Sequence, residues 1–360
     1  MVCCSFNGQN CLAQKSWVGV KTLKGQFITA QTLDRKMDSL LTATAIPGLS
    51  LAIVNDSSLV YHNTFGVVNS ATAQPVDDST IFEGASLSKP IFAYFALKMA
   101  EEGVLNLDEP LHNYLPHKNI ADSSLKDYKS ITARMVLSHR SGFPNHAHGQ
   151  EITLSFKPGT DFLYSGEGYQ YLAEVIAHLK GVDTGTQLNA LFQEYVTGPL
   201  DMPHSTFVWN SYLAAHKASG HNLSNKPTQK STPSSPNHPK KFHAYSSLHT
   251  EAYEYAQFLV ALIRAEGLKK TRIKEMLSEH TRFKDDNPLK IQIGQTGWGL
   301  GMAQKPTEYG MMHMHTGNNH DFQSYMMILP ERGFGIVFFI NCGKAIPFIQ
   351  GLNSVIGPIY

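Results

Sequence analysis

Hydrophobic and polar positions follow two different periods in the first part of this chain. Residues 29–44 carry apolar side chains at helical spacing, and Ile46-Pro47-Gly48 ends that segment. Two β-rich runs follow at 49–54 and 59–68, and the polar stretch 55–58 separates them. A polar turn between two such runs is typical of a β-hairpin. The pattern therefore predicts a helix followed by a hairpin.

The last third of the chain returns to a strand pattern. The predicted elements there are a helix at 253–265, strands at 311–315, 323–329 and 335–341, and a closing helix at 346–356. Between the two β-rich parts, residues 104–220 have mixed helical character, and the Pro- and Ser-rich run 222–243 predicts a long surface loop. Strands at both ends with helices between them predict one antiparallel sheet built from both ends, with a helical subdomain inserted.

Length and composition agree with a globular protein of this kind. The chain has 360 residues, of which 42% are hydrophobic and 10% aromatic, enough for a sizeable core. We predict a mobile tail at 1–15 and a single domain over 16–360. Within that domain the sheet region takes about 16–85 and 245–360, and the mainly helical insert takes about 90–243.

Charge and cysteine content exclude several classes of function. The 30 basic and 29 acidic residues nearly balance and form no long runs, so the chain lacks the basic surface of a nucleic-acid-binding protein. No apolar stretch is as long as a transmembrane helix. The N-terminus lacks the features of a secretory signal, which predicts a cytoplasmic protein, or a periplasmic or secreted one if a leader is missing. The four cysteines, Cys3, Cys4, Cys11 and Cys342, form no disulfide framework, and Cys342 is expected to be buried.

The tetrad Ser86-Leu87-Ser88-Lys89 is the first candidate for chemistry. It lies where a polar strand end turns into an apolar helix that runs to about residue 102. If the helix begins at or beside Ser86, the serine and Lys89 share one face, and the amine can take the hydroxyl proton. Pro90 disfavours the α conformation at Lys89, but a 3₁₀-like first turn would keep the pair together. A helix N-cap serine beside an exposed lysine fits the tetrad equally well.

The same spelling occurs a second time, at Ser123-Ser124-Leu125-Lys126. No apolar helix follows this copy, and the residues around it are polar. We therefore expect it to form a solvated surface loop. The Ser-x-x-Lys pattern alone is therefore not specific for a catalytic site.

Two further segments carry residues suited to the same chemistry. Tyr164 stands on a predicted turn just before a helix, where its phenol could relay a proton beside a cationic lysine. His315-Thr316-Gly317 lies at the end of a predicted strand, and a strand edge there can present a backbone N–H to an oxyanion.

Taken in order, the tetrad at Ser86, Tyr164 and His315-Thr316-Gly317 resemble the three motifs of the serine β-lactamase-related superfamily. That superfamily contains class C β-lactamases, D-alanyl-D-alanine carboxypeptidases, D-aminopeptidases and related esterases. Segments 131–143, 198–203 and 297–301 are also similar, and the resemblance covers roughly residues 25–345. It implies an α/β (α+β) fold of the β-lactamase/transpeptidase type, with an antiparallel sheet flanked by helices.

The resemblance also implies a metal-independent acyl-enzyme cycle. The residues it points to are Ser86, Lys89 and Tyr164 as catalytic groups, and His315, Gly317 and Asn318 on the substrate and oxyanion side. The backbone N–H groups of Ser86 and Asn318 would bind the oxyanion. The choice of Lys89 or Tyr164 as general base stays open. No cofactor and no metal are expected, and the partner is a small-molecule or peptide substrate, with the oligomeric state left open.

Two departures from the motifs narrow the substrate. Gly166 stands where lactam-recognising members commonly carry asparagine, and His315 replaces a common lysine with a largely neutral group. Both changes favour an esterase or a peptidase over a dedicated β-lactamase. The alternatives are a weak β-lactamase, and a non-catalytic binding or scaffold member of the same fold.

The 17 histidines also raise the question of a metal site. The closest pairs, His146 with His148 and His313 with His315, lack the further ligands that zinc normally requires. We expect His139 to brace a turn rather than to act in catalysis. Glu167, near the tyrosine motif, is expected either to touch substrate or to act as an ordinary acidic residue at a helix N-terminus.

Overall fold

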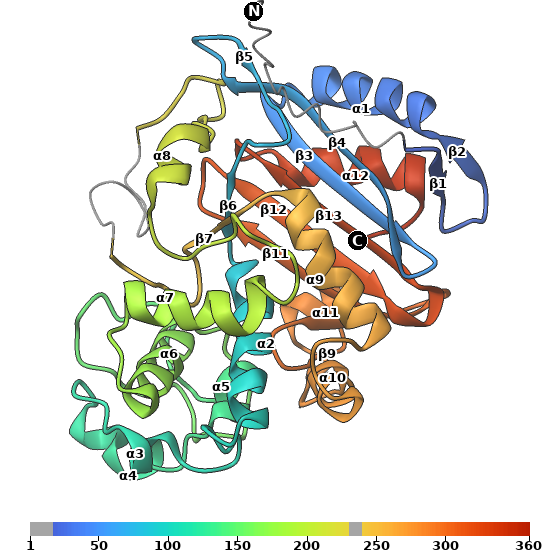
Figure 1. Ribbon diagram of the computed structural model, residues 1–360. Coiled ribbons are helices and arrows are strands. Elements are labelled where there is room, and N and C mark those ends of the chain that lie inside the picture. The colour runs from blue at the N-terminus through green and yellow to red at the C-terminus, as the bar shows by residue number, and fades with distance from the viewer. Residues whose placement is uncertain (1–16, 230–239) are drawn as a thin grey trace, which may run out of the picture.

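A large antiparallel sheet forms the centre of the molecule in the computed structural model, which describes residues 17–229 and 240–360 (Figure 1). Its strand order is β5-β4-β3-β13-β12-β11-β10-β9-β8, so strands from both ends of the chain meet where β3 pairs with β13. The strands are β3 (Gly48–Asn55), β4 (Ser58–Asn69), β5 (Gln74–Pro75), β8 (Thr281–Arg282), β9 (Gly297–Trp298), β10 (Ala303–Thr307), β11 (Gly310–Asn318), β12 (Gln323–Leu329) and β13 (Phe334–Ile340). The predicted antiparallel sheet is confirmed.

The hairpin β3–β4 forms where the sequence predicts it. Asp56 and Ser57 at its tip both have positive φ, the conformation of the two-residue turn that matches the twist of paired strands. Strand β3 is buried along its whole length because it lies inside the sheet. Its side chains alternate between the two faces: Leu49, Leu51 and Ile53 enter one core cluster, and Ala52 and Val54 enter the other.

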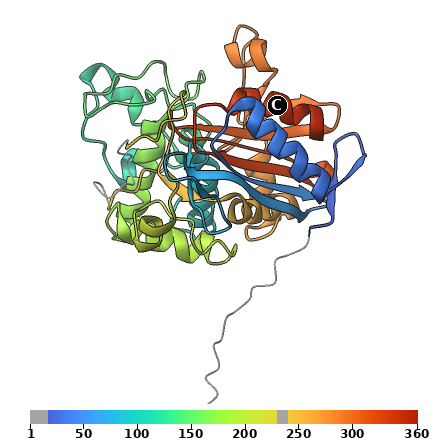
Figure 2. The same cartoon turned by 90° about the horizontal axis from the view of Figure 1, so that it is seen from above.

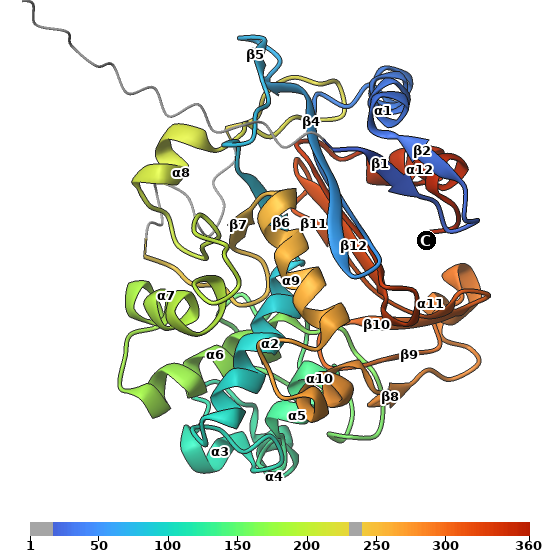
Figure 3. The same ribbon diagram turned by 45° about the vertical axis from the view of Figure 1, so that its right-hand side comes forward.

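Helices cover both faces of the sheet. Helix α1 (Ala30–Thr44) packs against α12 (Ala345–Ile356) on one face, and α9 (Ala252–Arg264) packs on β3 and β13 from the other (Figure 3). The short pair β1 (Gly19–Lys21) and β2 (Phe27–Thr29) lies beside α1. These three helices agree closely with the predicted ones, because each presents an apolar stripe of helical period to the sheet.

The remaining helices lie mainly to one side of the sheet, as the view from above shows (Figure 2). They are α2 (Ser88–Glu101), α3 (Leu111–Tyr114), α4 (Leu125–Tyr128), α5 (Ala133–Leu137), α6 (Gly166–Lys180), α7 (Thr186–Phe192), α8 (Ser211–His216), α10 (Lys270–Leu277) and α11 (Pro288–Ile293), with the turns η1 (Asp122–Ser124), η2 (Gln193–Thr197) and η3 (Pro330–Arg332). Helix α2 is buried almost all round, as expected of a helix that is apolar on every face. In the described ranges no helix has the length and apolar character needed to cross a membrane.

The start of α2 resolves the conflict that Pro90 raised. Ser86 and Leu87 form a turn, and the helix begins at Ser88, so Pro90 is its third residue. Because the first N–H groups of a helix have no intrahelical partner, proline costs little at this position. The Lys89 N–H donates to the Ser86 carbonyl at 3.0 Å, an i→i+3 bond of the 3₁₀ type.

The second tetrad corrects one expectation. Residues 122–128 form the short helical turns η1 and α4 instead of an open loop. Ser124 is buried, and its hydroxyl accepts a hydrogen bond from the Leu154 N–H at 2.9 Å, while Lys126 is exposed. This contact, together with the Ala121 N–H that donates to the Ile152 carbonyl at 2.9 Å, connects the polar stretch to a distant segment.

Three other expectations concern segments at or near the edge of the described structure. The predicted tail with Cys3, Cys4 and Cys11, and residues 230–239 of the predicted long loop, lie outside the described residues. Cys342 is buried, as expected, and burial raises the pKa of its thiol to about 11. The division of the chain into a tail and one domain stays a prediction.

Candidate active site

Ser86 follows directly on the short strand β6 (Phe82–Ala85), which pairs with β7 (Leu248–Thr250). Ala85 has a φ of 48°, a left-handed conformation that is costly for a residue with a side chain and is often found at functional sites. The Ser88 hydroxyl stabilises it by donating to the Ala85 carbonyl at 2.6 Å and accepting from the Leu248 N–H at 3.0 Å. Ser86 is partly exposed, whereas its neighbours on both sides are buried.

Strand β11 approaches this turn closely. A Cβ atom added to Gly317 would overlap the Ser324 hydroxyl and the Gly84 carbonyl, and would lie 3.2 Å from the Ala85 Cβ. The Ser324 hydroxyl on β12 donates to the same Gly84 carbonyl at 2.7 Å. Gly317 is therefore the residue that lets β11 lie against the end of β6, beside the turn that carries Ser86.

Lys89 points its amine at Ser86. Nζ lies 3.3 Å from Ser86 Oγ and donates to the Tyr245 carbonyl at 2.9 Å. The side chain is only 1% exposed, and this burial lowers the pKa of the amine well below its ordinary value. The lowered pKa makes the amine easier to deprotonate, and in its deprotonated form an amine at this distance can accept the Ser86 proton.

Tyr164 stands next to the same amine. Lys89 Nζ lies 4.5 Å from the centre of the phenol ring, and the Tyr164 hydroxyl lies 3.5 Å from His315 Nε2. Dense packing raises the pKa of Tyr164 well above its ordinary value, and a hydrogen bond with Ser86 opposes this only in part. The raised pKa favours the protonated phenol, and burial likewise disfavours the charged form of the neighbouring Lys89 amine.

His315 is the third side chain of the cluster. Its Nδ1 donates to the Thr316 carbonyl at 2.7 Å, which leaves Nε2 as the acceptor that faces Tyr164. Burial, and then the charge that Lys89 would carry, lower the pKa of His315 to about 3. The imidazole is therefore uncharged at neutral pH.

The tip of β11 is tied to β6 by polar contacts. Strand β10 pairs with β11 only as far as Met314, so this edge of the strand is free of β10 at Asn318. The Asn319 amide donates to Glu83 Oε2 at 2.7 Å, and Lys217 forms a 2.9 Å ion pair with the other oxygen of Glu83. The use of the Ser86 and Asn318 N–H groups as oxyanion donors stays a prediction.

The space left by the missing side chain at Gly166 is already occupied. Both the side-chain and main-chain oxygens of Asn145 accept from the Gly166 N–H, at 2.9 and 3.1 Å. A Cβ atom at 166 would lie 2.8 Å from the Asn145 carbonyl and 3.0 Å from the Tyr245 ring. An asparagine cannot be accommodated here without movement of these neighbours.

Tyr245 is the contributor that the sequence did not indicate. Its carbonyl accepts from Lys89 across 156 positions of sequence, and its ring centre lies 5.6 Å from the same Nζ. A backbone carbonyl leaves no residue-specific signal in a sequence, so no motif could have pointed to it. Its placement depends on Gln170, which donates to the Phe242 carbonyl at 3.3 Å and accepts from the Ala244 N–H at 3.2 Å.

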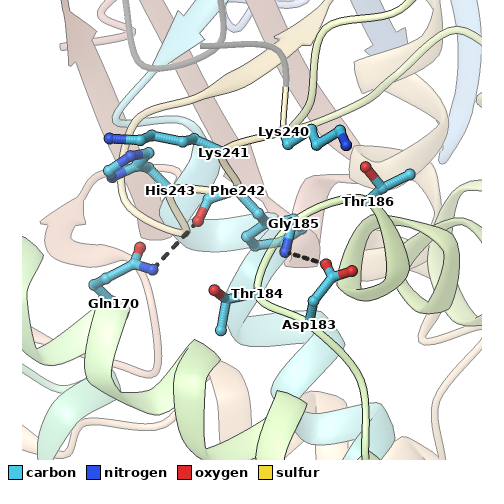
Figure 4. A pocket seen from close by; sticks show the side chains of 9 residues that line it. All are labelled: Gln170, Asp183, Thr184, Gly185, Thr186, Lys240, Lys241, Phe242 and His243. Atoms are coloured by element: carbon cyan, nitrogen blue, oxygen red, sulfur yellow. Dashed lines mark hydrogen bonds between the residues drawn. The ribbon is translucent and has the colours of Figure 1, made fainter.

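Gln170 also lines a pocket of about 470 Å³ between α6, α7 and residues 240–243 (Figure 4). The other lining residues are Asp183, Thr184, Gly185, Thr186, Lys240, Lys241, Phe242 and His243. None of Ser86, Lys89, Tyr164 and His315 belongs to this lining, so the pocket is separate from the cluster around Ser86. The pocket and the cluster are connected through Gln170, which hydrogen-bonds to the segment that carries Tyr245.

The histidines noted in the sequence take different positions. His139 is fully buried and contacts the Tyr164 turn, in agreement with its expected bracing role. His146 and His148 have ring centres 5.5 Å apart, and the Glu167 carboxylate accepts from the Ala147 N–H between them at 3.1 Å. Within residues 17–229 and 240–360, no three His, Cys, Asp or Glu side chains come together in a way that could hold a metal ion.

Comparison with known proteins gives a consistent result. A family model described as Beta-lactamase matches residues 33–356. Among curated proteins, protein flp of Staphylococcus aureus (strain MW2) is 23% identical over 91% of this chain, which spans 66% of that relative, slightly less than two thirds. A beta-lactamase of Pseudomonas fluorescens is 22% identical over 86% of this chain and 93% of the relative.

Solved structures share the fold. A penicillin-binding protein homologue from Pyrococcus abyssi, described as octameric, superposes with a TM-score of 0.73 at 21% identity, covering 91% of this chain and 77% of its own. The D-alanine carboxypeptidase AmpC from Burkholderia cenocepacia also superposes with a TM-score of 0.73, at 20% identity. The match covers 91% of this chain and 98% of the AmpC chain. At these identities the likeness shows the fold alone.

Proposed function

The chain belongs to the beta-lactamase family, and from this premise we propose that it is a serine hydrolase that forms an acyl-enzyme on Ser86. One observation carries the proposal: a buried lysine amine, whose pKa is lowered by its burial, lies 3.3 Å from the hydroxyl of a partly exposed serine. A serine hydroxyl is a weak nucleophile until a base takes its proton, and this geometry supplies the base.

The first step forms the acyl-enzyme. The Ser86 proton moves to Lys89 Nζ while Ser86 Oγ bonds to the substrate carbonyl carbon, whose oxygen becomes an oxyanion. The N–H groups of Ser86 and Asn318 are the proposed donors to that oxyanion. The intermediate then expels its leaving group, which takes the Tyr164 proton, and the Lys89 ammonium returns a proton to Tyr164. In this step the bond from the carbonyl carbon to the leaving group breaks.

The second step releases the acyl group. A water molecule loses a proton to Lys89, and its oxygen attacks the acyl carbon. The bond to Ser86 Oγ then breaks, and Ser86 regains a proton from the pair formed by Lys89 and Tyr164. The site returns to its neutral resting state.

The electrostatics of the site favour an uncharged ester or amide substrate. Burial lowers the pKa of both Lys89 and His315 and so disfavours a positive charge on either side chain. A substrate carboxylate would therefore gain no fixed positive partner from them. For this reason we place esterase-like or peptidase-like activity ahead of a dedicated β-lactamase.

The main alternative is a binding or scaffold protein that keeps the fold without turnover. Gly166 and His315 motivate it, because both depart from the family's motifs. Hydrogen-bond contact between Lys89 and Ser86 supports the hydrolase instead, since a buried lysine with a lowered pKa beside a serine hydroxyl is typical of a catalytic site.

Ser86→Ala, assayed with p-nitrophenyl esters, nitrocefin and D-alanyl substrates, tests the proposal. We expect wild type to turn over at least one ester or amide, and Ser86→Ala to lose this activity by about 10³-fold or more. The matched control is Ser123→Ala, which changes the same position of the second tetrad. Mass spectrometry after fluorophosphonate treatment should place the adduct on Ser86. Unchanged hydrolysis in Ser86→Ala would rule the proposal out.

A further inference from the structure

His139 lies directly against Tyr164, and the reaction described above gives it no part. We propose that His139 is the positioning residue for Tyr164: it fixes the phenol beside Lys89 and His315 and covers one face of the ring. This inference rests on the proposed function, because it depends on the part assigned to Tyr164.

Two hydrogen bonds connect His139 to the backbone on either side of Tyr164. The Leu163 N–H donates to the His139 carbonyl at 2.9 Å, and the Ser165 N–H donates to His139 Nδ1 at 3.1 Å. Both peptide neighbours of the tyrosine are therefore attached to a single residue. A shift of the Tyr164 backbone would break at least one of these bonds.

Ring contacts hold the phenol itself. The His139 and Tyr164 ring centres lie 4.5 Å apart at an angle of 38°, a tilted stack. Trp298 closes the group, with its ring centre 5.1 Å from His139 and 5.9 Å from Tyr164. His139 has no exposed surface, so no water reaches the phenol through its position.

The backbone of His139 allows these contacts to form at once. Its φ of 58° is left-handed, a conformation in which histidine is found more often than most residues with a side chain. The residue follows α5, and the Arg140 N–H closes that helix by donating to the Met135 carbonyl at 2.7 Å. With α5 ended in this way, both the carbonyl and the ring of His139 bond to the Tyr164 turn.

The protonation state indicates positioning rather than proton transfer. Because Nδ1 accepts a hydrogen bond, the proton of the neutral ring is on Nε2, which is buried and has no partner among the described residues. Burial, followed by the charges that Lys89 and His315 would carry, lowers the pKa of His139 well below its ordinary value. A charged ring here would also oppose the Lys89 ammonium that forms during acylation.

Two substitutions separate the hydrogen bond from the ring. His139→Phe keeps an aromatic ring but removes the acceptor of the Ser165 N–H, whereas His139→Asn keeps an acceptor, tolerates the left-handed backbone and removes the ring. The matched control is His249→Asn. His249 is equally buried, its Nδ1 also bonds locally, to the Ser247 carbonyl, and it has no recorded contact with the four side chains of the site.

We expect His139→Phe to lower kcat for the best ester by about 10–100-fold with KM within about threefold, since displacement of a catalytic group by a fraction of an ångström has effects of this order. His139→Asn should lose less than about tenfold. The acid limb of the rate profile should move to higher pH in His139→Phe, because water that reaches Lys89 brings the pKa of its amine back toward normal. The titratable groups around that amine are Tyr164, Tyr169, Tyr245, His139, His146 and His315.

A folded His139→Phe with wild-type kcat and an unmoved pH profile would overturn the inference. The inference would also be overturned if His139→Phe and His249→Asn lowered Tm equally and His139→Phe lost no more kcat than His249→Asn. A readout that needs no turnover is the ¹³Cζ signal of Tyr164, assigned with Tyr164→Phe: it should shift or broaden in His139→Phe and stay in place in His249→Asn. If wild-type Ser86 takes no fluorophosphonate, the proposed function fails, whereas this signal still decides the role of His139.

Discussion

The two Ser-x-x-Lys tetrads of this chain have the same spacing of serine and lysine but different surroundings in the structure. Ser86 lies on the turn between β6 and the buried helix α2, and Lys89 is in the first turn of α2, where the amine is buried and its pKa is lowered. Ser123 and Lys126 lie on two short helical turns and are exposed. The difference teaches that the surroundings proposed for a nucleophile and its base, a buried lysine next to a partly exposed serine, come from the fold and not from the spacing of the two residues.

The largest expected effect comes from removing the amine. Lys89→Met keeps the length and apolar stem of the side chain but leaves Ser86 without a base, so kcat for an ester should fall by about 10³-fold or more. The free energy of unfolding should change by no more than about 1 kcal/mol or rise, because the buried amine is replaced by an apolar group of similar volume. Kinetics and urea unfolding measure the two effects.

Lys126→Met is the matched control, since it makes the same change in the exposed tetrad. It should leave both kcat and the urea midpoint unchanged. Comparable losses in the two methionine variants would contradict the distinction drawn between the tetrads.

A second test changes the strand that lies beside the first tetrad. Gly317→Ala introduces a methyl group that overlaps the Ser324 hydroxyl and the Gly84 carbonyl, so β11 must move away from Ser86. We expect kcat to fall by about 10–100-fold and stability by about 1–3 kcal/mol. Gly335→Ala on β13 is the control, because its methyl would meet only the ends of flexible side chains. Wild-type kinetics in Gly317→Ala would show that this close approach is not needed.

Stability should depend on pH through Lys89. Its pKa is lowered in the folded protein, so between that value and the unfolded value of about 10.4 the unfolded chain binds more protons. Stability therefore rises with pH across this window, by up to about 1.4 kcal/mol per pH unit, and the stabilising effect is absent below the folded pKa. The difference in unfolding free energy between wild type and Lys89→Met should rise in the same way. A difference that stays flat with pH would mean that the amine is charged in the folded protein.

The smallest expected effect belongs to the second tetrad. Ser124→Ala removes the buried acceptor of the Leu154 N–H and should cost about 1–2 kcal/mol in the free energy of unfolding, with kcat unchanged. Ser123→Ala should leave stability as it is, because Ser123 is exposed. Loss of activity in Ser124→Ala or Ser123→Ala would contradict the prediction that the second tetrad has no part in catalysis.

The elements set by local patterns were predicted well. The stripe of α1, the turn at 55–58 and the run of β13 each depend on neighbouring residues, and each appears within one or two residues of its predicted range. The solvated surface loop predicted at 123–126 is exposed at Ser123 and Lys126 but is helical, and its buried Ser124 accepts from the N–H of Leu154, 30 residues away. The pattern of hydrophobic and polar residues in a short stretch of sequence carries no information about contacts between residues so far apart.

The candidate site follows the same division. Ser86, Lys89, Tyr164 and His315 are side chains with a chemical identity, so motifs could indicate them, and the structure brings all four together. The Tyr245 carbonyl that holds Lys89 could be found only in the structure, because every residue has a carbonyl. The lowered pKa of the Lys89 amine and the raised pKa of the Tyr164 phenol also follow from burial, which no spacing of residues encodes.

The sequence by itself determined which groups this protein can use: a serine, a lysine, a tyrosine and a neutral histidine, on elements whose periods define a sheet flanked by helices. Only the tertiary structure decided in which of the two Ser-x-x-Lys tetrads the lysine is buried, and that the His139 ring packs against Tyr164. The physical reason is that composition and period act locally along the chain. Desolvation and close contact arise where distant segments meet.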